Sequence, residues 1–174
     1  WENLPADSVP GVFRYRILQA MDTGVVSPIF LWLTRWPNTV LPVEQRDKAL
    51  KALESWLVRR MLCRLTAKDL NRTLLDLLQE LKAQPVANAG DVTTEFLTRQ
   101  TAESRYWPSD DAVRATLVDE PLYRALLRAR LRMVLEALED DMRTSMSEAP
   151  CPRNLTVEHI MPQAWRDHWN AANL

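Results

Sequence analysis

The side chains best suited to chemistry lie in one short segment near the C-terminal end of this 174-residue sequence. Glu158 and His159 are adjacent there, and His159 is one of only two histidines. Imidazole can accept a proton near neutral pH, and a carboxylate is a hard oxygen ligand that suits Mg²⁺ or Mn²⁺. Phosphodiester hydrolysis needs a base that activates water and a divalent cation that stabilises developing charge. The pair therefore indicates a metal-dependent site for this reaction.

The sequence around the pair sets a geometric condition on that site. Residues 155–157 are short and β-prone, and Pro162 breaks the chain just after the pair. Neighbouring residues on a strand point to opposite faces, so the strand must end or twist at Glu158 for both side chains to reach one phosphate. Taken alone, a Glu-His dipeptide is more often a surface or capping pair without chemistry.

The wider motif resembles a known nuclease family. Its residues are Leu155-Thr156-Val157-Glu158-His159-Ile160-Met161-Pro162-Gln163, with Trp169 beyond. They resemble the nuclease motif of the GmrSD family, which are modification-dependent (type IV) restriction endonucleases. The SspE-type nicking proteins of phosphorothioation-based phage defence share this C-terminal module. The stretch from Tyr123 through Glu139 resembles the long helix that precedes the motif in the family.

This resemblance implies a DNA endonuclease or nickase of the HNH (ββα-metal, His-Me finger) type. His159 would be the general base, and Glu158 would hold the divalent metal, Mg²⁺ or Mn²⁺. Gln163 would orient the metal ligands without binding the metal itself. The substrate would be double-stranded DNA, in the bacterial cytoplasm. The family also has an N-terminal nucleotide-hydrolysing sensor domain, which would be a partner within the same protein.

The organisation expected from the sequence is a helical domain over residues 1–150 and the start of an HNH-type motif over residues 151–174. We expect this motif to be incomplete, because only Asn173-Leu174 could belong to the closing strand and helix that the family has after the catalytic pair. A fragment of this kind would be weakly active or inactive. The DNA modification recognised, nicking against double-strand cleavage, and the oligomeric state stay open.

The body of the chain is predicted to be helical. It has only three glycines, and apolar residues recur with a spacing of three and four. Helices are expected from near Gly11, over 29–36, after Pro42, over 70–81, 92–102 and 110–117, and in one long helix after Pro121. The fold class is therefore mainly α, a bundle of about seven or eight helices, with a short β element near 155–160.

Basic residues form two groups that could contact DNA phosphates. The net charge is −1, so any DNA contact must come from local patches. One patch surrounds a helix junction and contains Arg59, Arg60, Arg64, Lys68 and Arg72. The other is a row with helical spacing, Arg124, Arg128 and Arg132. Phosphate contacts need no sequence-specific geometry, but a solvated helix face with acidic neighbours is the simpler explanation of both groups. The helix-junction patch is the better candidate for DNA contact, because fewer acidic residues interrupt it.

Other features limit the range of functions. Cys63 and Cys151 have no metal or redox spacing, and no apolar run is long enough to span a bilayer. Two alternatives to the nuclease interpretation stay open. One is a helical scaffold or interaction domain with a degenerate motif, and the other is a DNA-binding domain that does not cleave.

Overall fold

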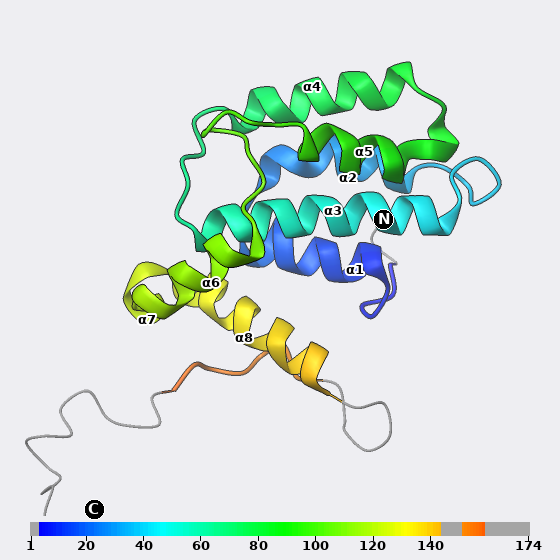
Figure 1. Ribbon diagram of the computed structural model, residues 1–174. Coiled ribbons are helices and arrows are strands. Elements are labelled where there is room, and N and C mark those ends of the chain that lie inside the picture. Colours follow the sequence, from blue (N-terminus) through cyan, green and yellow to red (C-terminus); the bar gives the residue numbers. More distant parts are fainter. Residues whose placement is uncertain (1–3, 144–150, 159–174) are drawn as a thin grey trace, which may run out of the picture. The chain divides into compact units, whose positions relative to one another are not determined.

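The computed structural model describes residues 4–143 and 151–158, and these residues are mainly helical, as predicted (Figure 1). The α-helices in this part of the chain are α1 (Val9–Phe13), α2 (Ser27–Thr34), α3 (Val43–Leu62), α4 (Leu70–Ala83), α5 (Ala89–Thr98), α6 (Asp110–Asp119), α7 (Leu122–Ala125) and α8 (Arg128–Met142). A π-helix, η1 (Arg14–Ala20), continues α1, and two short 3₁₀ helices, η2 (Gly24–Val26) and η3 (Val86–Asn88), precede α2 and α5.

The chain divides into two compact units, Trp1–Ala125 and Leu126–Leu174. The first unit contains α1 to α7, and the second contains α8 and the described residues 151–158. The sequence predicts a domain boundary at residue 150, where the helical pattern gives way to the nuclease motif. The structure groups α8 with residues 151–158, and the predicted domain bounds 1–150 and 151–174 stay a prediction.

Helix α3 is the centre of the first unit. It packs against α1, α2, α5 and α6, and Figure 1 shows it lying between α1 and α5. Its apolar face is buried, as its spacing predicted, and this face contains Ala49, Leu50, Leu53, Trp56 and Leu57. Fully burying a leucine side chain such as Leu50 or Leu53 stabilises the folded state by about 1.5–3 kcal/mol relative to leaving it exposed. The core of the first unit therefore contains apolar residues whose helical spacing is visible in the sequence.

Gly90 allows α5 to pack closely on α3. A Cβ atom at this position would lie 2.5 Å from the backbone oxygen of Gln45 and 2.8 Å from the Cβ atom of Lys48, both on α3. A backbone atom cannot move aside cheaply, so glycine is required by the close approach of the two helices. The sequence from Pro85 to Gly90 predicts a turn or linker, which is shorter in the structure because α5 already begins at Ala89.

We expect Gly90→Ala to lower the free energy of unfolding by about 1–3 kcal/mol, because the two helices must separate or distort. Gly24→Ala is the matched control, since a Cβ atom there meets nothing within 4 Å. Urea unfolding followed by circular dichroism measures both variants. Equal stability of the two variants would contradict the packing role of Gly90.

Three local predictions differ from the structure. The long helix expected after Pro121 is interrupted, because Leu127 has an extended backbone (φ −59°, ψ 144°) between α7 and α8. The pattern Thr66-Ala67-Lys68-Asp69 resembles a capping box and predicts a capped start of α4, but this cap does not form. The Asp69 carboxylate accepts a hydrogen bond from Ser104 instead. The described residues 155–158 do not form the expected strand. A strand needs a neighbour for its backbone hydrogen bonds, and the described part of the chain contains no strand.

None of the helices in the described ranges has the length and apolar character needed to cross a membrane.

Candidate active site

The structure describes one member of the predicted catalytic pair. Glu158 is exposed and is the last residue of the described segment 151–158, whereas His159 and Gln163 lie outside the described residues. Among the residues that the structure describes, no group of three or more His, Cys, Asp or Glu side chains is placed to hold a metal ion. The described part of the site therefore consists of Glu158, the segment that leads to it and the side chains that hold this segment.

Helix α8 presents a polar row toward that chain. Arg132, Glu136 and Asp140 recur every four residues, so they lie along one face of the helix. Arg132 Nε lies 3.6 Å from Glu136 Oε1. The row thus places one positive and then two negative side chains next to the segment before Glu158.

Arg153 joins this row from the segment 151–158. Its Nη2 atom donates a hydrogen bond of 2.7 Å to Asp140 Oδ2, and its Nη1 atom lies 3.7 Å from Glu136 Oε2. Two residues later, the carbonyl oxygen of Leu155 accepts a hydrogen bond of 3.3 Å from Arg132 Nη1. We call the four side chains Arg132, Glu136, Asp140 and Arg153 the α8 anchor.

Burial makes the α8 anchor more than a surface ion pair. Glu136 is only 4% exposed, and a buried carboxylate is costly unless charges and hydrogen bonds compensate it. Two guanidinium groups flank it, so the anchor contains two positive and two negative side chains. Burial alone would lower the pKa of Arg153, but the hydrogen bond to Asp140 and the charges of Asp140, Glu136 and Cys151 raise it. Arg153 thus stays a cation at every pH of interest.

The row Arg124, Arg128 and Arg132 does not lie on one helix. Arg124 belongs to α7 and the other two to α8, which begins at Arg128. Arg124 and Arg128 are exposed. Arg132 is committed to Glu136 and to the backbone of Leu155. We therefore assign Arg132 to the α8 anchor and keep only Arg124 and Arg128 as candidates for DNA contact.

The second basic group has members in very different environments. Arg59 pairs with Asp110 at 2.6 Å and also donates to the carbonyl oxygen of Pro108, and the hydrogen bond from Arg59 lowers the pKa of Asp110. Arg64 pairs with Glu120 at 3.2 Å on the surface. Lys68 and Arg72 are exposed, and they remain the members of this group best placed to meet a phosphate.

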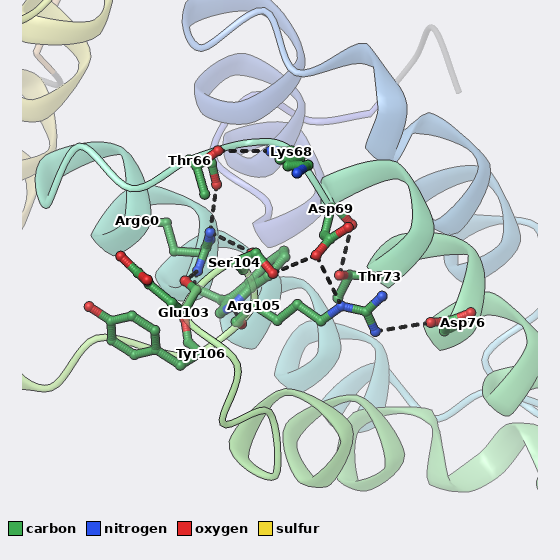
Figure 2. A network of polar contacts seen from close by, with 11 residues as sticks. Arg60, Thr66, Lys68, Asp69, Thr73, Asp76, Glu103, Ser104, Arg105 and Tyr106 are labelled. Atoms are coloured by element: carbon green, nitrogen blue, oxygen red, sulfur yellow. Dashed lines mark hydrogen bonds and ion pairs between the residues drawn. The ribbon is translucent and has the colours of Figure 1, made fainter.

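Arg60 is a structural residue. It is 6% exposed, and its guanidinium group lies 5.4 Å from the centre of the Trp56 ring. Figure 2 shows its hydrogen bonds to backbone carbonyl oxygens, which belong to Thr66, Glu103, Ser104 and Tyr106. Burial lowers the pKa of Arg60. We leave Arg60 out of the candidate DNA-contacting set, because its donors already hold the loop over 103–106 against α3.

The network around Arg60 continues along the same loop (Figure 2). Ser104 donates to Asp69 at 2.5 Å, and Arg105 donates to Asp76 at 3.2 Å. The hydrogen bond from Ser104 is the main cause of a lowered pKa of Asp69. This polar network fastens a loop without regular structure to α3 and α4. It supports the helical body and does not resemble a catalytic arrangement.

Sequence reasoning did not single out Glu136, Asp140 or Arg153. A signal was present for the first two, because Arg132, Glu136 and Asp140 have the four-residue spacing of an ion-paired helix face. Arg153 has no local signal, since the sequence predicts a loop over residues 144–154 that contains it, and only folding brings it back to α8.

Comparison with known proteins supports the resemblance inferred from the motif. Residues 107–174 match the family model of the C-terminal domain of GmrSD restriction endonucleases, which confirms the resemblance for this part of the chain. The matched range is less than half of the 174-residue chain, and it includes α6, α7 and α8 as well as the predicted nuclease motif. No match was found among curated proteins or among solved structures. The match relates the C-terminal part of this chain to restriction endonuclease function.

Proposed function

We propose that this chain, with its C-terminal part similar to the C-terminal domain of GmrSD restriction endonucleases, contributes the DNA-cleaving site of a bacterial restriction system directed against phage. The match over residues 107–174 is the observation that carries this proposal. We further propose an HNH-type site that nicks double-stranded DNA in the cytoplasm, and a nucleotide-hydrolysing sensor domain as its partner in the same protein.

In the proposed mechanism, His159 is the general base. Its imidazole takes a proton from water, the water oxygen forms a bond to phosphorus, and one phosphorus–oxygen ester bond breaks. The leaving oxygen is then protonated, so that one end of the cut strand carries a phosphate and the other end a hydroxyl. A base placed in this way contributes about 10²- to 10⁴-fold to the rate.

Glu158 is suited to hold part of a divalent metal site. It is an exposed carboxylate, and such oxygen ligands fit Mg²⁺ or Mn²⁺. A bound cation of this kind would stabilise the negative charge that develops on the phosphate. One carboxylate is too few for a complete site, so we propose that the other ligands come from residues beyond Glu158, with Gln163 supporting them.

Exposed basic side chains are proposed to hold the DNA backbone. The candidates are Lys68 and Arg72 in the first unit, together with Arg124 and Arg128. Arg59 and Arg64 are secondary candidates, because each already pairs with a carboxylate. Contacts of this kind provide affinity without sequence preference and weaken as salt is raised.

The proposal is tested by incubating the complete protein with supercoiled plasmid. We expect open-circular product with Mg²⁺ or Mn²⁺ and none after excess EDTA, because the cation is required for charge stabilisation. Product formation in EDTA would contradict metal dependence. A protein that shifts the plasmid on a gel without nicking it would be a DNA-binding domain. A protein that does neither, even at low salt, would be a scaffold with a degenerate motif.

A further inference from the structure

The α8 anchor holds the chain immediately before the proposed catalytic pair at two points. Arg153 is held through Asp140 and Glu136, and Leu155 is held through its carbonyl oxygen by Arg132. The partners on α8 run backward, from residue 140 to residue 132, as the segment runs forward. Two points of attachment fix both the place and the direction of this segment along α8.

Chain length then limits where Glu158 can be. It follows Leu155 by three residues, and a chain spans at most about 3.3–3.6 Å per residue, so the two Cα atoms are within roughly 10 Å of one another. Segment 151–158 forms no helix or strand, so no helical or ladder hydrogen bonds hold it in place. The anchor therefore replaces regular secondary structure as the support for this segment.

We propose that the α8 anchor is a positioning device for the Glu158–His159 pair, in which Glu136, Asp140, Arg132 and Arg153 act without touching DNA, water or metal. This inference rests on the proposed nuclease function. Misplacing a catalytic group by about 1 Å can lower a rate by roughly a hundredfold, and loss of residues that support metal ligands costs about 10- to 100-fold. Removing the anchor thus lowers turnover while the DNA-contacting surface persists.

The chain provides matched controls for two of the anchor residues. Glu136 and Asp140 are held in the anchor, whereas Glu139 and Asp141 are exposed residues of the same helix and have no part in it. The test pairs are Glu136→Gln with Glu139→Gln, and Asp140→Asn with Asp141→Asn. Each pair makes the same chemical change and removes the same charge.

The first measurement is the attachment itself, which does not depend on nuclease activity. Trypsin cleaves after arginine, and we expect the Arg153–Asn154 bond to be cut at least severalfold faster in Glu136→Gln and Asp140→Asn than in the control variants. Mass spectrometry of the complete protein during limited digestion gives this rate for one bond. Equal rates in the anchor and control variants would overturn the inference.

The second measurement is plasmid nicking under saturating Mg²⁺. We expect kcat to fall roughly 10- to 100-fold in the two anchor variants, with KM for DNA unchanged and with control variants at the wild-type rate. We expect kcat of Arg153→Lys to lie between the values of the wild type and of the two anchor variants. The lysine ammonium group keeps the positive charge but cannot bridge two carboxylates as the guanidinium fork does. Unchanged kcat in the anchor variants of an active enzyme would overturn positioning and leave the nuclease proposal standing. A wild-type protein that does not nick would overturn both.

Discussion

Replacement of His159 with alanine is expected to lower the rate of plasmid nicking by about 10²- to 10⁴-fold, the range that a general base contributes. Without imidazole, a water molecule near the phosphate has no side chain to take its proton. The loss should appear in kcat, because a base acts on the reacting water and not on the binding of DNA. The measurement is the initial rate of open-circle formation at saturating protein and Mg²⁺.

His168→Ala is the natural control, since His168 is the second of the two histidines and lies outside the nine-residue motif. We expect it to nick at the wild-type rate. Equal rates for wild type and His159→Ala would remove His159 from the mechanism.

The other large effect is expected from Arg60→Gln, in the helical body. Its guanidinium group satisfies carbonyl oxygens that belong to four residues, and the shorter amide cannot reach them all. A buried acceptor left without a donor costs about 1–3 kcal/mol, and water can replace some of the lost bonds. We therefore expect the free energy of unfolding of the helical body to fall by about 2–4 kcal/mol in urea, measured by circular dichroism.

Arg64→Gln separates this effect from a general loss of positive charge. Arg64 is more than half exposed and makes a surface pair with Glu120, so its replacement should cost less than about 1 kcal/mol. Both substitutions remove one charge from the same helix-junction patch. If Arg60→Gln were no more destabilising than Arg64→Gln, the loop over 103–106 would not depend on Arg60.

The elements with strong local signals were predictable. α3 and α4 follow apolar stripes, and most members of these stripes are buried. α6 begins after Ser109, whose side chain accepts a hydrogen bond from the backbone of Ala112 as an N-cap should. Each of these features is decided by residues within a few positions of one another. The break between α7 and α8 was missed, because Leu127 is apolar and continues the helical pattern while its backbone is extended.

The catalytic hypothesis rests on the sequence alone. Glu158 and His159 are adjacent, and their motif is local, so no fold is needed to read it or to match residues 107–174 to a family of restriction endonucleases. What holds the motif could not be read in the same way. Arg153 is thirteen positions from Asp140, and the carbonyl oxygen of Leu155 is twenty-three positions from Arg132.

Tertiary structure also decided which basic residues are buried, paired or exposed. Arg59, Arg60 and Arg64 are close in sequence and identical in chemistry, yet one pairs with Asp110, one is buried under the loop over 103–106, and one lies on the surface. Pro108, Tyr106 and Glu120, which contact Arg59, Arg60 and Arg64 respectively, lie more than forty positions away in the sequence. Periodicity and motifs record local preferences of the chain, whereas burial and ion pairing depend on which distant segments return to a helix, and only the folded chain determines that.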